Sequence, residues 1–115
     1  MKIIKFEDLI AWQKSQDLAV VIYNEFDQLR DFSFRDQVRR AVVSISNNVA
    51  EGFDRSSKAD FVRFLYIALA SCSELKSMLY LAERLNYISA EIRIDFIGRA
   101  SEISRILTGL IKSLK

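Results

Sequence analysis

Residues 37–52 read QVRRAVVSISNNVAEG, and this stretch determines how the rest of the chain is interpreted. Its apolar side chains recur every three or four residues, which is the spacing of one face of an α-helix. They are Val38, Ala41, Val42, Ile45 and Val49. Polar side chains follow a second line of the same spacing. The stretch therefore predicts an amphipathic helix with one buried side and a polar flank.

The composition of the whole chain favours a helical protein. Its 115 residues are 50% hydrophobic and 28% charged, with three glycines and no proline. A β-rich fold needs more turn residues than this, and a chain of this length forms one core. We therefore expect a single all-α domain over residues 1–115.

Short polar breaks divide the helical pattern into four segments. These cover about residues 8–28, 33 to 52–55, 57–86 and 89–114. Ser33 and Ser57 each precede an aspartate by three residues, which is a capping-box pattern, and Asn86 suits a left-handed helix end. Because the connections are short, we expect an antiparallel up-down-up-down four-helix bundle.

Two segments are apolar on every side of their helices, residues 18–23 and 64–70. In a bundle of four, each helix leaves one face to water, so the spare apolar faces would form exposed patches, which usually mark interfaces. We therefore expect a homo-oligomer. The alternative is a monomer with a thick core that leaves only the hydroxyls of Tyr23 and Tyr66 at the surface.

A polar stripe on the second predicted helix forms a network with polar positions on the third if the two stripes face each other. The residues are Gln37, Arg40, Ser44, Asn48, Glu51 and Arg55, with Ser71 and Glu74 opposite. We interpret them as a semi-buried network that fixes helix register, with Arg40 or Arg55 as the counter-ion of the carboxylates. The alternative is a pocket that uses Glu51 and Glu74 as paired catalytic carboxylates.

The chain lacks the residues that several kinds of functional site require. There is no histidine, and Cys72 is the single cysteine, so zinc sites, histidine triads and disulfides are excluded. The glycines form no phosphate loop, and Gly109 is expected to allow close helix approach. We expect no catalytic residue, cofactor or metal. Early acidic residues and short uncharged runs argue against a secretory signal and a membrane span, and predict a cytoplasmic protein.

Basic residues gather in three places, although the formal net charge is only +2. The candidate nucleic-acid contacts are Arg35, Arg39, Arg40, Arg55, Lys58, Arg63, Arg105, Lys112 and Lys115. Sequence-tolerant binding to RNA or DNA depends on such phosphate-neutralising side chains. Assembly into a ring would repeat each cluster and strengthen the local potential.

The run 37–52, followed by Arg55, resembles the bacterial four-helix-bundle family of proteins encoded in intervening sequences of large-subunit ribosomal RNA genes. Further landmarks match in order, namely Phe6, Leu9, Trp12, FVRFLYIALAS at 61–71, Glu74-Leu75 and the LIKSL ending. Ser46-Asn47 replaces a common proline-alanine, so the second helix should run unkinked.

This resemblance implies a homopentameric ring. It also implies likeness to the accessory variability protein of diversity-generating retroelements, which has a basic pentameric surface and works with a reverse transcriptase and nucleic acid. Many family members have no known function. The matching positions Arg40, Ser44, Asn48, Glu51, Arg55, Ser71 and Glu74 are motif residues with no assigned catalysis.

Three hypotheses follow for the function. The leading one is a non-enzymatic homo-oligomer that binds RNA, DNA or a nucleic-acid-processing protein through its repeated basic surface. The second is a protein-interaction scaffold without nucleic-acid binding, which docks a partner helix between its own helices. The third, an enzyme that uses Glu51 and Glu74, has the least support.

Overall fold

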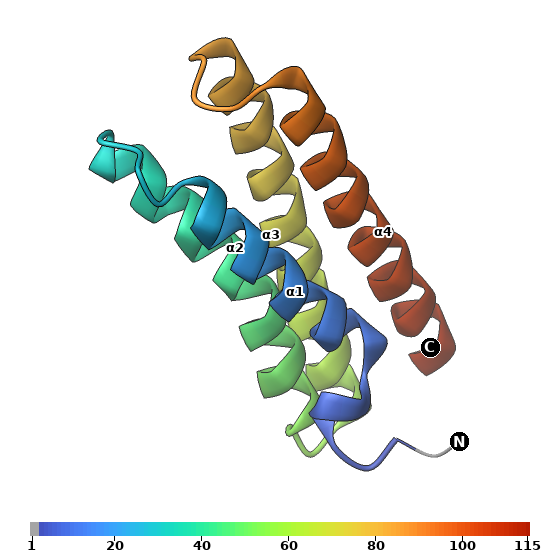
Figure 1. Cartoon of the computed structure of the whole chain (residues 1–115). Helices are drawn as coiled ribbons and strands as arrows, with labels where there is room; N and C mark the ends of the chain where they lie inside the picture. Colours follow the sequence, from blue (N-terminus) through green and yellow to red (C-terminus); the bar gives the residue numbers. More distant parts are fainter. Residues whose placement is uncertain (1–2) are drawn as a thin grey trace.

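The computed structural model describes residues 3–115 and contains four long α-helices. A short 3-10 helix η1 (Phe6–Asp8) leads into α1 (Ile10–Glu25), α2 (Phe32–Phe53), α3 (Lys58–Arg84) and α4 (Ala90–Leu114). Successive helices run antiparallel in a bundle that measures 43 × 22 × 20 Å (Figure 1). The predicted all-α, up-down-up-down four-helix bundle is confirmed.

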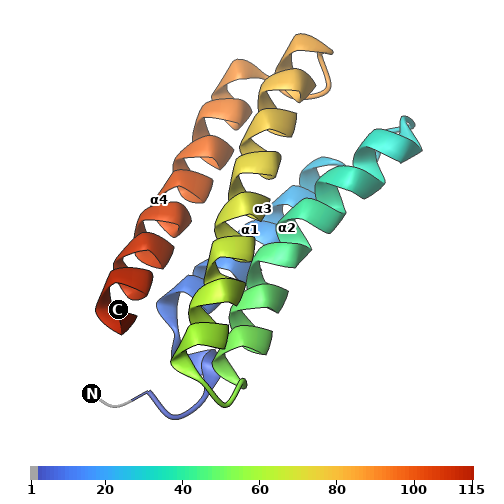
Figure 2. The same ribbon diagram turned by 180° about the vertical axis from the view of Figure 1, so that it is seen from behind.

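The helices occupy the four corners of the bundle in chain order. Each helix contacts its neighbours in the chain, and α1 also contacts α4. Within residues 3–115 no contact joins α1 to α3 or α2 to α4, so these pairs lie diagonally opposite each other. Seen from behind, α3 and α2 form the near side of the molecule (Figure 2). Each of these two helices therefore turns one long side outward on this side of the bundle.

Serine hydroxyls cap the starts of α3 and α4, and the cap predicted at Ser57 is confirmed. The hydroxyls of Ser57 and Ser89 accept hydrogen bonds from the backbone N–H of Asp60 and Ile92, both at 3.1 Å. These bonds satisfy amide groups that have no partner inside the helix. At the other end of α3, Asn86 has the predicted left-handed backbone, with φ of 62°.

The predicted capping box at Ser33 is wrong, because Asp31 takes that role. Its Oδ1 accepts a hydrogen bond from the N–H of Phe34 at 3.1 Å, so α2 begins at Phe32. Its Oδ2 accepts a second bond, from the hydroxyl of Tyr87, at 2.7 Å. This bond lowers the pKa of the Asp31 carboxyl and raises the pKa of the Tyr87 phenol. Asp31 thus links the α1–α2 turn to the α3–α4 turn.

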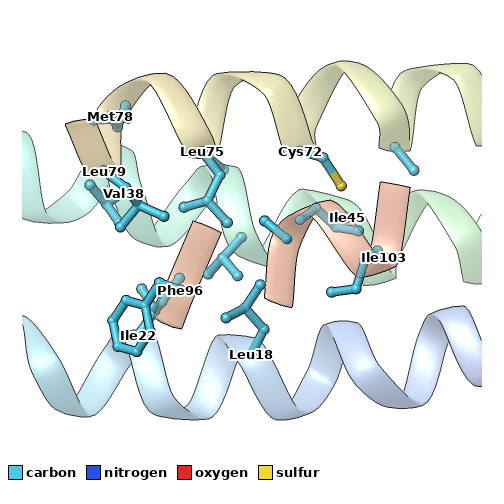
Figure 3. Close-up of a cluster of buried hydrophobic side chains, with 14 of the residues drawn as sticks. Leu18, Ile22, Val38, Ile45, Cys72, Leu75, Met78, Leu79, Phe96 and Ile103 are labelled. Carbon is cyan, nitrogen blue, oxygen red and sulfur yellow. The ribbon is translucent and has the colours of Figure 1, made fainter. Parts of the chain in front are cut away.

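All four helices contribute to one hydrophobic core, part of which Figure 3 shows. The apolar lines predicted for α2 and α3 are buried nearly throughout. In α1 the buried line is Ala11, Ser15, Leu18 and Ile22. Trp12 and Ala19 are half-buried on the flank of this line. Cys72 lies fully inside the core, and burial raises the pKa of its thiol, which fits the structural role expected for it.

One glycine sets the distance between α2 and α3. A Cβ atom at Gly52 would lie 2.6 Å from the Cβ of Phe64, so only glycine fits there without movement. The close approach expected at Gly109 is wrong, since a Cβ atom there would meet nothing within 4 Å. Helix α2 continues without interruption through Ser46 and Asn47.

The spare apolar faces of α1 and α3 are exposed. Val20 is 61% exposed on α1 and Ile67 is 39% exposed on α3, so the bundle does not bury every side of these helices. The thick-core alternative is therefore wrong, while self-association stays a prediction. Helix α3 is long and apolar enough to cross a membrane by length and composition alone. Of its most apolar 18 residues, 44% are buried inside the bundle.

Candidate functional site

Hydrogen bonds join α2 to α3 at the centre of the predicted polar stripe. The hydroxyls of Ser44 and Ser71 lie 2.9 Å apart, and the side-chain amide of Asn48 donates to the Ser44 hydroxyl at 2.9 Å. Ser71 donates its proton to the carbonyl of Ile67 at 3.2 Å. Because a hydroxyl has one proton, Ser44 is the donor to Ser71. This relay is partly buried and fixes the register of the two helices.

The charged members of the stripe do not join this relay. Arg40, Glu51 and Glu74 are exposed, and no hydrogen bond or ion pair in residues 3–115 involves them. Arg55 places its guanidinium 4.8 Å from the centre of the Phe64 ring instead. The expected semi-buried carboxylates with an arginine counter-ion are therefore corrected. The physical reason is helix rotation, because the charged residues lie on the outer flanks of α2 and α3, where water solvates them.

An open groove of about 710 Å³ follows the outer side of α2. We call it the α2 groove. Its lining includes Arg40, Ser44, Asn48 and Glu51 of the predicted stripe, together with Tyr23 and Asn47, which sequence reasoning missed. The position of Asn47 could have been found, because it lies three or four residues from Ser44 and Glu51. Tyr23 could not, since it comes from another helix.

Arg39 fastens α1 to α2 beside this groove. Its Nη2 donates to the backbone carbonyl of Tyr23 at 3.1 Å, and its guanidinium lies 4.5 Å from the centre of the Tyr23 ring. A cation at the end of a helix also interacts favourably with the helix dipole. Arg39 was expected to contact nucleic acid, but these contacts give it a structural role at the end of α1.

Five of the nine predicted basic residues lie at one end of the bundle. The α2–α3 turn and the end of α4 lie at the same end of the bundle, as Figure 1 shows. Lys115 donates from Nζ to the hydroxyl of Tyr66 at 3.1 Å, which joins the end of α4 to the first half of α3. We call this region the basic end. It comprises Arg55, Lys58, Arg63, Lys112 and Lys115.

Two aromatic rings support the cations of the basic end, although sequence reasoning found no aromatic platform. Arg55 and Arg63 both lie 4.8 Å from the centre of the Phe64 ring, and Lys115 lies 5.3 Å from the centre of the Tyr66 ring. Such cation–π contacts hold the charged groups in fixed positions while leaving them open to ligands. The proximity of Arg63, Phe64 and Tyr66 in the sequence was the signal that could have revealed this.

The other four basic candidates lie elsewhere. Arg35, Arg39 and Arg40 are on the first half of α2, and Arg35 pairs with Asp36 at 3.3 Å. Arg105 lies midway along α4, in a shallow depression that also contains Glu102. The predicted basic residues are thus divided between separate parts of the surface, and the largest group of them lies at the basic end.

Comparison with known proteins identifies the family. The profile of the 23S rRNA-intervening sequence protein family matches residues 7–109. The crystal structure of a protein of unknown function from the S23 ribosomal protein family of Bacteroides thetaiotaomicron is similar, with a TM-score of 0.84 and 31% sequence identity. The similarity covers 90% of this chain and 99% of that chain. A search of curated proteins found no match. Neither description names an enzyme, and the chain belongs to the 23S rRNA-intervening sequence protein family.

Proposed function

We propose that this protein is a non-enzymatic helical bundle that assembles with copies of itself and binds nucleic acid through the basic end. The observation that carries the nucleic-acid proposal is the charge of the two segments that lie at this end. Residues 54–63 and 106–115 together contain five basic residues and two acidic ones. The rest of the chain is acidic on balance, since the whole has a net charge of only +2.

The arrangement of these cations suits a phosphate backbone better than a defined small ligand. Lys58 and Lys112 form no ion pair within residues 3–115, and Arg55 rests on an aromatic ring without a carboxylate partner. Arg63 is paired with Asp60 at 3.7 Å, but both side chains are exposed. Exposed ion pairs contribute little and are easily exchanged for a phosphate. Nothing in the basic end reads a base edge, so we propose sequence-tolerant binding.

Self-association would strengthen nucleic-acid binding, because a single copy has few cations to offer a phosphate backbone. Repeating the basic end around a ring multiplies the cations that one nucleic acid can reach, and avidity rises accordingly. The exposed apolar side chains of α1 and α3 provide the surface that association would bury. The family resemblance favours five copies, and the likeness to the accessory variability protein favours a nucleic-acid-processing partner. We place the protein in the cytoplasm on the sequence features given above.

Fluorescence anisotropy with a labelled structured RNA tests this proposal. We expect binding that weakens steeply between about 50 and 200 mM salt, as counterion release requires. Removing two cations from the basic end with K58Q/K112Q should reduce the slope of log K against log salt by about 1 for each phosphate that is no longer neutralised.

The matched control is K14Q/R99Q, which removes the same charge from the opposite, α1–α4 side. Lys14 and Arg99 lie on α1 and α4, outside the basic end, so we expect the salt slope to stay unchanged. Absence of salt-dependent binding by the wild-type protein to both RNA and DNA would refute the nucleic-acid proposal. With assembly intact, that result would favour the protein-interaction scaffold.

A further inference from the structure

We infer that the outer side of α3 in one copy packs head to tail against the α2 groove of the next copy. This inference rests on the proposed self-association and specifies the two surfaces and the charge pairs that make the contact.

The outer side of α3 is the most apolar exposed surface of the described chain. Four of the eleven large exposed hydrophobic residues lie on this helix. Tyr66 and Ile67 are 49% and 39% exposed near its start, and Tyr80 and Leu81 are 52% and 45% exposed near its end. The small side chain of Ala70 lies exposed between these two pairs, together with Ser73. We call residues 66–81 the α3 ridge.

The α2 groove matches this ridge in length. The groove extends from Asp36 to Glu51, and the ridge extends from Tyr66 to Leu81. Each spans the same number of residues, or about 22 Å at the rise of an α-helix. A ridge on one helix that enters a groove along another is the usual way in which helices pack. The wider side of the bundle, 43 Å long and about 20 Å across, also provides the roughly 800 Å² per partner of a standard interface.

The positions of the two surfaces favour a closed ring. Helices α2 and α3 occupy adjacent corners of the bundle, so their outer sides do not lie on opposite sides of the molecule. Head-to-tail contact between such surfaces turns each copy relative to the last and can close into a ring, whereas contact between opposite sides produces an open filament. The α2–α3 contact therefore explains how exposed apolar surface can be covered without unlimited growth.

The register within one copy predicts which charges meet across the interface. Ser44 and Ser71 are at the same height, and Gly52 lies against Phe64. Since α2 and α3 are antiparallel, Arg40 is one turn from Ser44 at about the height of Glu74. A ring that runs around an axis parallel to the bundle has no shift along that axis. Arg40 of one copy is therefore level with the partner's Glu74.

A second pair follows from the same register. Glu51 is level with Arg63, next to the Gly52–Phe64 contact. Both pairs have opposite charge, and Arg40, Glu51 and Glu74 have no ion-pair partner within residues 3–115. Arg63 contacts Asp60 at 3.7 Å in a single copy, and this exposed pair is easily exchanged. In the assembly Arg63 would belong to the interface and no longer to the phosphate-binding cations. The charged members of the polar stripe, which water solvates in a single copy, would thus find their partners in the next copy. Complementary charges of this kind fix the register of an interface.

Charge reversal tests the inference by sedimentation velocity over a range of protein concentrations. We expect Glu74→Arg and Arg40→Glu each to weaken self-association by about tenfold or more, because each places like charges together. The double variant E74R/R40E should restore it to within about threefold of wild type. Asp17→Arg is the matched control, since it makes the same charge change between α1 and α4 and should have no effect.

A steric variant tests the same contact independently of charge. Ala70 lies exposed at the centre of the α3 ridge, so Ala70→Trp should leave the helix content unchanged and reduce assembly by about tenfold or more. Thr108→Trp on the exposed side of α4 is its control. If wild type assembles and neither the single reversals nor Ala70→Trp weaken assembly, the inferred surfaces are wrong while the proposed assembly stands. If wild type is monomeric, both are wrong.

Discussion

Substituting Gly52 by alanine adds one methyl group where α2 meets α3. The added carbon would lie 2.6 Å from the Cβ of Phe64, 3.1 Å from Cδ1 of Phe61 and 3.3 Å from the Phe61 carbonyl. The first contact is with an atom fixed to the backbone, so a rotation of the Phe64 side chain cannot relieve it. Helices α2 and α3 must therefore move apart.

Two opposing effects determine the size of the change. Overpacking a close contact costs about 1–3 kcal/mol. Alanine also gains about 1 kcal/mol over glycine in a helix interior, and less at Gly52, the second-last residue of α2. The contact is shorter than real Cβ atoms tolerate and involves a Cβ atom that moves only with its backbone, so we place the steric cost at the upper end of its range. Gly52→Ala should then reduce the free energy of unfolding by about 2 kcal/mol.

Urea unfolding followed by circular dichroism measures this effect, with all variants at the same protein concentration because assembly adds to apparent stability. Gly98→Ala and Gly109→Ala are matched controls. Both glycines are helical, and an added Cβ atom meets nothing within 4 Å at either position. Each control should stabilise the protein by about 0.5–1 kcal/mol, since only the gain in helix propensity remains.

Stabilisation by all three substitutions would refute the reasoning. It would mean that α2 and α3 do not approach each other closely at Gly52. The register on which the inferred charge pairs depend would then also lose one of its two supports, leaving only the hydrogen bond between Ser44 and Ser71.

Two further predictions concern the hydrogen bonds that join the helices. Ser71→Ala leaves the Ser44 hydroxyl without its acceptor and should cost about 1 kcal/mol in urea unfolding. Ser73→Ala, on the exposed side of the same helix, should change stability by less than about 0.5 kcal/mol, and equal effects of both would contradict a role for the relay. Because the pKa of Asp31 is lowered, its carboxylate stabilises the fold fully at pH values above the ordinary pKa of 3.8. This contribution is lost as the pH falls through the lowered pKa. Tyr87→Phe removes the main cause of the shift, so melting curves between about pH 2 and 6 should show a smaller acid-side loss of stability than wild type. An identical loss would show that the Tyr87–Asp31 bond is unimportant.

Periodicity was sufficient to predict the fold. The apolar side chains in residues 37–52 and in the other segments recur at helical spacing, and a bundle of four antiparallel helices buries them. The serine caps at Ser57 and Ser89 set the starts of α3 and α4. The cap of α2 was misplaced because Ser33 and Asp31 are both good capping residues. The choice depends on Tyr87, which is 56 positions away and reaches only Asp31.

The candidate site was predicted less completely, because a helical wheel gives the side of a helix but not how far that side turns toward its neighbour. Ser44, Asn48 and Ser71 face inward and form hydrogen bonds, whereas Glu51 and Glu74 are rotated outward by a fraction of a turn. The contact of Arg55 and Arg63 with the Phe64 ring could not be predicted from the sequence, because it depends on how the α2–α3 turn folds back.

The mass of the wild-type protein in solution, measured by light scattering at micromolar concentration, tests the central claim most directly. The nucleic-acid proposal draws its strength from repeated cations, and the α3 ridge needs a second copy to cover it. We predict a mass that is a small whole-number multiple of 13.3 kDa, about five if the family resemblance extends to assembly. A mass of 13.3 kDa would contradict the assembly, the inferred interface and the multiplied positive surface together.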